Sequence, residues 1–193
     1  MTTDIFYVSD NYGRELQVEL PVEIGATYKE LCQKYKTRYL MEAVQAAALY
    51  AACRIHHQPR TLEEVKDLTG IPVPYIGKAF NKMGLKLPLS KPEEYIDRHL
   101  ASLGYNDPDK LKEISERAKR IIESARHCED FCCVCNKVPS SVASGAVYIS
   151  GILSGDRRTQ VEVAEACHIT SASVNKHYKD LAKKADIIDR VLL

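Results

Sequence analysis

The chain contains an internal repeat. When the sequence is shifted by 98 residues, residues 43–84 align with residues 141–182 without a gap, and nine of the 42 aligned positions are identical. Unrelated sequences of ordinary composition would share roughly two or three of them. Solenoid repeats have periods of about 20–50 residues, so the longer spacing is typical of a duplicated small domain. We therefore predict two domains of similar fold, with residues 1–88 in the first and residues 89–193 in the second.

The composition is that of an ordinary globular protein. The chain has 193 residues, of which 45% are hydrophobic and 27% charged, so each copy is long enough to bury a core. The net charge is +1, so nucleic-acid binding would require a local basic patch. No apolar stretch approaches the ~20 residues of a membrane span, and the N-terminus lacks a signal-peptide pattern. We expect an intracellular protein without a membrane partner, whose seven cysteines are reduced.

The spacing of apolar residues predicts helices along most of the chain. Residues 42–56 and residues 139–153 are apolar nearly all round and rich in small side chains, which is typical of a central, buried helix. One apolar face follows Pro21, and two further helices are predicted over residues 92–103 and 108–126. The fold class is therefore all-α.

Each copy then shows the pattern of a helix-turn-helix. A short helix begins with a Thr-x-x-Glu capping box, in which the threonine hydroxyl and the glutamate satisfy backbone amides at the helix start. These residues are Thr61 and Glu64 in the first copy and Thr159 and Glu162 in the second. A break follows at Gly70 or His168. The next helix begins at Pro72 in the first copy and at Thr170 or Ser171 in the second, which gives the short helix, tight turn and longer helix of this motif.

The first twenty residues fit two interpretations. Leu16, Val18, Leu20 and Val22 alternate with polar residues, and residues 10–13 would serve as a turn, which indicates a strand. The segment RELQVELP also resembles a short helix that ends at a Leu-Pro junction. We favour a short, poorly formed helix.

Several motifs resemble the core of transcription factor IIB and its archaeal counterpart. They are AVQAAALYAACR, PRTLEEV and YIGKAF in the first copy, and VASGAVYISGIL, DRRTQVEVAEACHIT and SVNKHYKDL in the second. The resemblance covers roughly residues 20–185 and implies two tandem five-helix cyclin-like domains, each ending in a helix-turn-helix. It also implies a non-enzymatic factor that binds the TATA-binding protein and promoter DNA, with RNA polymerase as a further partner and no small-molecule substrate. Such a protein would be cytoplasmic in an archaeon or nuclear in a eukaryote.

The predicted final helix, residues 170–184, is the candidate DNA-binding element. It carries four lysines against one aspartate, a net charge of +3 in a nearly neutral chain. Lysines neutralise phosphates, and the N-terminal residues of a recognition helix face base edges. The predicted DNA-binding residues are Arg157, Arg158, Thr170, Ser171, Ala172, Ser173, Asn175, Lys176 and Lys179. A lysine-rich helix is also typical of a solvated face, so the alternative is a cyclin-box module that binds only protein.

Two features depart from the family pattern. Family members begin with a zinc ribbon that docks RNA polymerase, whereas this sequence has no such cysteine pairs near its N-terminus. We therefore expect a divergent or regulatory paralogue that does not dock polymerase through a ribbon. Ala172 and Asn175 stand where the family commonly has a valine and an arginine. Loss of the arginine removes a strong guanine or phosphate contact, so the upstream-element preference is expected to differ.

A cysteine-rich segment, HCEDFCCVC at residues 127–135, is the candidate metal site. His127, Cys128, Cys132 and Cys135 are the residues that could complete a zinc tetrahedron. Structural zinc sites usually draw ligand pairs from two separated segments, and no second pair is evident, so we predict inert thiols and no bound metal, with redox sensing as a further alternative. No catalytic constellation or phosphate-binding loop appears in the sequence, so we expect neither an enzyme nor a cofactor.

Overall fold

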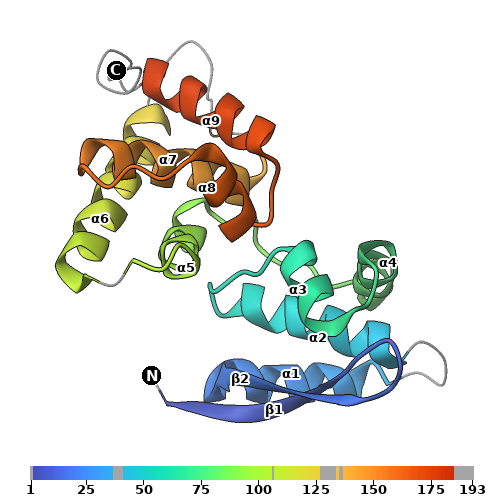
Figure 1. Cartoon of the computed structure of the whole chain (residues 1–193). Helices are drawn as coiled ribbons and strands as arrows, with labels where there is room; N and C mark the ends of the chain where they lie inside the picture. Colours follow the sequence, from blue (N-terminus) through green and yellow to red (C-terminus); the bar gives the residue numbers. More distant parts are fainter. Residues whose placement is uncertain (1, 37–40, 106, 127–133, 135–136, 185–193) are drawn as a thin grey trace. The chain divides into compact units, whose positions relative to one another are not determined.

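A computed structural model of the chain describes residues 2–36, 41–105, 107–126, 134 and 137–184. The chain divides into two compact units, Met1–Ser90 and Lys91–Leu193. The elements of the first are β1 (Thr3–Ser9), β2 (Glu15–Pro21), α1 (Val22–Lys34), α2 (Met41–Ile55), α3 (Leu62–Thr69) and α4 (Val73–Met83) (Figure 1). Those of the second are α5 (Glu93–Ser102), α6 (Pro108–Arg126), α7 (Pro139–Leu153), α8 (Gln160–Ala166) and α9 (Ser171–Lys184). The predominance of helices confirms the predicted all-α class. The five predicted helices are present among the described residues of the second unit, whereas the described part of the first unit has four helices and a β-hairpin before them. None of the helices in the described residues has the length and hydropathy needed to cross a membrane.

The N-terminal segment is a β-hairpin, so the favoured helix at this position is wrong. β1 and β2 pair antiparallel, with Phe6 opposite Val18 and Val8 opposite Leu16. Side chains two residues apart on a strand face the same side, and this alternation buries Phe6, Val8, Val18 and Leu20 on one face. A helix with the same sequence would distribute these residues around its circumference. The hairpin is therefore more stable than a helix here, because it buries all four side chains.

The turn of the hairpin is organised around Asp10. Its carboxylate accepts hydrogen bonds from the backbone amides of Tyr12 and Arg14, both at 2.8 Å, and from Arg14 Nε at 2.7 Å. Burial alone would raise the pKa of Asp10, but the hydrogen bonds from Arg14 and Tyr12 lower it below its ordinary value. The charged form of Asp10 is thus the one that holds the turn.

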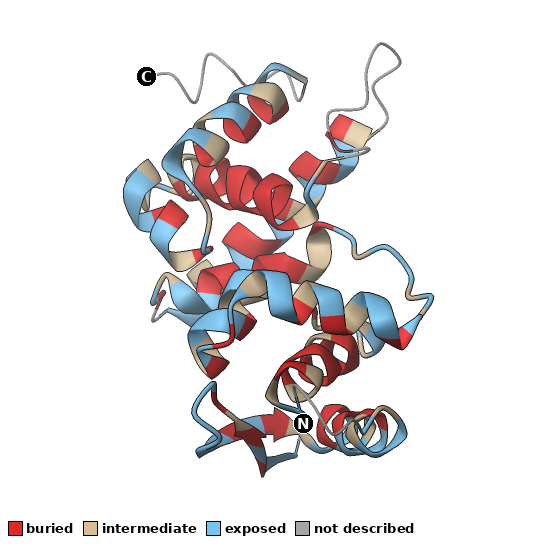
Figure 2. Cartoon of the chain, turned by 90° about the vertical axis from the view of Figure 1, so that its right-hand side faces the viewer, coloured by how far each residue is buried: buried red, intermediate tan, exposed pale blue. Residues whose placement is uncertain are grey.

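Each unit is built around one helix that is apolar nearly all round, as the sequence predicts. In the first unit this is α2, whose buried alanines lie against α1, α3 and α4. In the second unit it is α7, in which every residue from Ser140 to Gly151 is buried; such central helices appear in red in Figure 2. An aromatic pair occupies the aligned position in both cores. Tyr50 and Phe80 have ring centroids 5.2 Å apart, and Tyr148 and Tyr178 have theirs 4.9 Å apart.

Both predicted capping boxes are present. Thr61 and Thr159 each accept a hydrogen bond from the amide of the glutamate three residues later, and each glutamate accepts one from the threonine amide. The turns that follow adopt left-handed backbone at Gly70 (φ 69°) and His168 (φ 52°). The breaks that the sequence predicts at these two residues are therefore confirmed.

Candidate nucleic-acid interface

Residues 159–184 form the second helix-turn-helix, and local hydrogen bonds set its geometry. After α8, the amide of Ile169 donates to the carbonyl of Ala164 at 3.0 Å, which closes the turn. The hydroxyl of Thr170 then accepts a hydrogen bond from the amide of Ser173 at 3.2 Å and caps the start of α9. Thr170, which the sequence predicts as a DNA contact, therefore also caps the helix.

The inner face of α9 fixes the helix on the core of the second unit. Val174, Tyr178 and Leu181 are buried and face α7, which is the helix in closest contact with α9. At the crossing, a Cβ built on Gly145 would lie 2.9 Å from the backbone of His177 and Tyr178. Only a glycine permits this approach, so the orientation of α9 on its unit is set by backbone contact.

The outer face of α9 carries the positive charge. Ala172, Lys176, Lys179 and Lys183 are exposed, and their spacing of four, three and four residues aligns them within about 60° of the helix circumference. We call Lys176, Lys179 and Lys183 the lysine stripe. Within the described part of the chain, none of these three side chains forms a salt bridge or hydrogen bond. Their charge is thus available to an external anion such as a phosphate backbone.

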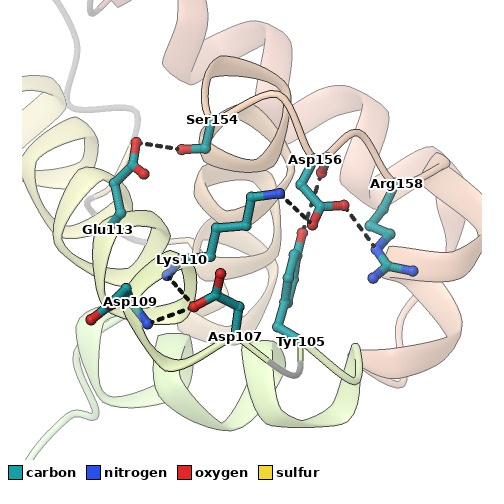
Figure 3. Close-up of polar contacts among 8 residues, drawn as sticks. All are labelled: Tyr105, Asp107, Asp109, Lys110, Glu113, Ser154, Asp156 and Arg158. Carbon is teal, nitrogen blue, oxygen red and sulfur yellow. Dashed lines mark hydrogen bonds and ion pairs between the residues drawn. The ribbon is translucent and has the colours of Figure 1, made fainter.

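The two predicted arginines before α8 differ in their surroundings. Arg157 is exposed, whereas the Arg158 guanidinium lies 5.0 Å from the centroid of the Tyr105 ring, and Arg158 Nε lies 3.7 Å from Asp156 Oδ1. Tyr105 in turn donates a hydrogen bond to the carbonyl of Asp156 at 3.4 Å, and Lys110 Nζ approaches Asp156 Oδ2 at 3.6 Å (Figure 3). Arg158 therefore belongs to a cluster that fixes the loop between α7 and α8. Sequence reasoning missed Tyr105 because it lies between α5 and α6, and no motif links it to Arg158.

The remaining predicted base-reading residues are not equally accessible. Ser171 and Ala172 are exposed, while Ser173 and Asn175 are half-buried. The Oδ1 atom of Asn175 is buried and has no hydrogen-bond partner among the described residues. A bidentate contact with adenine needs both amide atoms, so Asn175 would have to change rotamer to make one.

The four candidate metal ligands belong to the cysteine-rich segment, residues 127–135. His127, Cys128, Cys132 and Cys135 lie outside the described residues, and no cluster of three potential ligands occurs among the described ones. Of the other cysteines, Cys53 and Cys167 are buried in the two cores, where they pack as small hydrophobic side chains. Burial also raises the pKa of the Cys32 thiol to about 11, only partly offset by a hydrogen bond with Tyr28, so this thiol is protonated at neutral pH.

Comparison with known proteins identifies the repeated unit. The family model described as "Transcription factor TFIIB repeat" matches residues 16–86 and again residues 85–184. The chain is 38% identical over 151 residues to "Transcription initiation factor IIB" of Methanoculleus marisnigri, a match that covers 76% of this chain and 42% of the relative. The protein of the same name from Archaeoglobus fulgidus is also 38% identical over 151 residues, with 76% and 44% covered.

"Transcription initiation factor IIB 2" of Thermococcus kodakarensis matches a longer stretch. It is 34% identical over 194 residues, which covers 94% of this chain and 60% of that protein. The chain thus spans roughly half the length of these relatives. The family is one of transcription factors and not of enzymes, in agreement with the prediction from the sequence. With two repeat matches that together reach from residue 16 to residue 184, the chain belongs to the transcription factor TFIIB repeat family.

Proposed function

We propose that this protein acts in transcription initiation by binding the complex of TATA-binding protein and promoter DNA, and that α9 contacts the DNA. The observation that carries this proposal is the lysine stripe, because it concentrates positive charge, without a partner among the described residues, on the exposed face of a helix-turn-helix in a chain of net charge +1. Phosphate contacts of this kind supply affinity and orientation without reading sequence. The names of the relatives support the role in initiation.

We also propose that the protein is a divergent or regulatory member of the family that reads DNA sequence weakly, because the start of α9 offers few side chains suited to base contacts. Ala172 is exposed and offers a methyl group that suits a thymine methyl, while Asn175 stands half-buried where the family commonly has an arginine. Without that arginine the bidentate guanine contact is lost, so most of the affinity for DNA would come from phosphates. A few phosphate contacts give weak binding alone, and TATA-binding protein would supply the rest. The protein would then act inside the cell, where promoter DNA is found.

A gel-shift assay tests the proposal. The wild-type chain should shift a TATA-containing duplex weakly alone and strongly in the presence of TATA-binding protein. The double variant Lys176→Glu/Lys179→Glu should lose the ternary complex, because two favourable phosphate contacts become repulsive. A matched control is Lys112→Glu/Arg120→Glu, which makes the same change of charge on exposed positions of α6.

The outcomes separate the two candidate functions. Loss of the ternary complex in the α9 variant, with retention in the α6 control, supports DNA contact through α9. Equal binding by both variants would exclude it and would favour a cyclin-like module that binds only protein. Circular dichroism of each variant should match the wild type, since all four substituted side chains are exposed.

A further inference from the structure

The two edges of the N-terminal hairpin are not equivalent. Beyond the strand ends, the amide of Asp10 donates to the carbonyl of Arg14 at 2.9 Å, and the amide of Val22 donates to the carbonyl of Thr2 at 3.2 Å. The same register pairs even-numbered residues with even-numbered ones throughout the ladder. The even-numbered pairs therefore hold the hydrogen bonds between the strands, and the odd-numbered residues direct their backbone groups outward.

The outer edge of β1 is closed by side chains of its own unit. The hydroxyl of Tyr28 on α1 donates to the carbonyl of Tyr7 at 2.9 Å. The amide of Ser9 donates to Gln45 Oε1 on α2 at 2.7 Å, and the amide of Ile5 donates to Asp4 Oδ1 at 2.8 Å. A further strand could not pair along β1 without breaking these contacts.

The outer edge of β2 is open. The odd-numbered residues Glu15, Gln17 and Glu19 are exposed, and their backbone groups bond to no other described residue. Unpaired amides and carbonyls in an extended row are a template for another strand. The described part of this hairpin thus has one edge capped and one edge competent for strand addition.

The charge around the open edge indicates which kind of strand fits it. Asp4, Glu15, Glu19 and Glu23 are exposed, and the single arginine of the hairpin, Arg14, is bound to Asp10. Nucleic acid would be repelled by this surface. A second copy would be repelled as well, because antiparallel pairing of two β2 strands about Gln17 would set Glu15 opposite Glu19 twice.

Apolar surface next to the acidic edge adds to the selectivity. Ile5 and Tyr7 are each 52% exposed and lie opposite Glu19 and Gln17 in the ladder, on the same face of the sheet as these residues. Long basic side chains bury an aliphatic stem while their charge stays in water. A lysine or arginine opposite Glu19 would therefore meet a carboxylate on β2, and its aliphatic stem could extend across β2 toward Ile5 on β1.

We propose that β2 binds an extended, basic segment of a partner protein as the third strand of the sheet. The incoming strand runs antiparallel to β2, hydrogen-bonds to the backbone of Glu15, Gln17 and Glu19, and carries basic residues four positions apart opposite the two glutamates. The residues of this surface belong to the first unit and the lysine stripe belongs to the second, so different variants test the two proposals.

The probe for this surface is a fluorescein-labelled nine-residue peptide with the core Lys-Val-Thr-Val-Lys, and the control probe has glutamate in place of both lysines. Amide exchange followed by NMR gives a signature specific to strand addition. With the lysine peptide bound, exchange at Glu15, Gln17 and Glu19 should slow at least about tenfold, while the amides of Val18 and Leu20, already bonded to β1, should not change. The glutamate peptide should produce no protection.

Two variants make the test decisive. Gln17→Pro removes the central outward amide without touching the bonds to β1, since proline is tolerated on an edge strand, and should weaken binding at least about tenfold. Glu15→Lys/Glu19→Lys keeps every backbone group and should reverse the preference toward the glutamate peptide. If Gln17→Pro fails to fold, the peptide preference of Glu15→Lys/Glu19→Lys alone tests the proposal.

Three outcomes would overturn the proposal. The first is a lysine peptide that leaves exchange at the three outward amides unchanged. The second is charge reversal that does not alter which peptide binds. The third is sedimentation showing a wild-type dimer that Gln17→Pro abolishes, because the occupant of the edge would then be a second copy.

Discussion

Gly145 of α7 lies against the backbone of His177 in α9, so closely that a Cβ at residue 145 would come within 2.9 Å of the His177 carbonyl carbon. The aligned residue in the first unit is Ala47, which carries the methyl group that residue 145 cannot. The glycine is thus specific to the unit that bears the lysine stripe. It lets the candidate DNA-binding helix rest directly on the central helix, which limits how far that helix can shift.

Substituting Gly145 by alanine should destabilise the second unit. Overpacking costs about 1–3 kcal/mol, and alanine returns about 1 kcal/mol through its higher helix propensity, so a net loss of about 1 kcal/mol is expected. The control is Gly77→Ala in α4, where a Cβ meets nothing within 4 Å and a gain of about 0.5–1 kcal/mol is expected. Urea denaturation measures both, and two changes of the same sign would refute the close contact.

The aligned loops show which features the sequence could predict. At two left-handed positions the copies exchange glycine and histidine: His57 (φ 55°) aligns with Gly155 (φ 72°), and Gly70 aligns with His168. The backbone is retained while the residue type is not, so a search for glycine alone would find only half of these turns. The capping boxes and the central helices were predictable because each depends on residues within a few positions of one another. The Tyr105–Arg158 contact was not, because it joins distant segments.

Arg157 and Arg158 should respond differently to substitution by alanine. Arg158→Ala removes the cation–π contact with the Tyr105 ring, which is worth about 0.5–1 kcal/mol at a partly exposed site. It also removes the ion pair with Asp156, which is worth about 0–1 kcal/mol. It should therefore lower the stability of the second unit by about 1 kcal/mol. Arg157→Ala should leave stability within about 0.5 kcal/mol of wild type and should reduce the salt dependence of ternary-complex formation by about one unit of slope. Chemical denaturation and salt-dependent gel shifts distinguish the two, and a stability loss confined to Arg157→Ala would contradict the structure.

The packing of the hairpin against α1 should require a glycine at residue 25. A Cβ at this residue would overlap the ring of Phe6, which is only 4% exposed, so Gly25→Ala should displace β1 from α1 and cost about 1–3 kcal/mol. Phe6→Val makes room for the methyl group, so the double variant should lose less than the sum of the single losses. A double-mutant cycle in urea, with amide exchange at Phe6 and Val8 as the local probe, measures this coupling. Strict additivity would mean that the ring and residue 25 do not touch.

The hairpin also shows that the alternation of apolar residues indicated the right structure, while the Leu-Pro junction favoured the wrong one. Val18 and Leu20 alternate with polar residues, but the sequence of β2 alone does not reveal the partner strand, which supplies Phe6 and Val8. A two-stranded ribbon is stable only when a third element covers its apolar face. Here that element is α1, and its capacity to receive Phe6 comes from a glycine within a helix, which sequence rules count as unfavourable.

His177 should make the second unit sensitive to acid. Burial lowers the pKa of His177 below its ordinary value of 6.5; Asp180 opposes this, and the nearby charges of Lys176 and Lys137 add to it. Near pH 6.5 the unfolded chain then binds a proton at His177 that the folded chain does not bind. Titration of His177 therefore leaves the unfolding free energy unchanged well above that pH and lowers it as the pH decreases below it. The urea midpoint should therefore decrease between pH 7.5 and pH 5.5 in the wild type and decrease less in His177→Gln, which keeps a polar side chain of similar size without the titration. An NMR titration of the imidazole in the folded chain gives an independent check, and an apparent pKa above 6.5 would contradict the burial of this residue against α7.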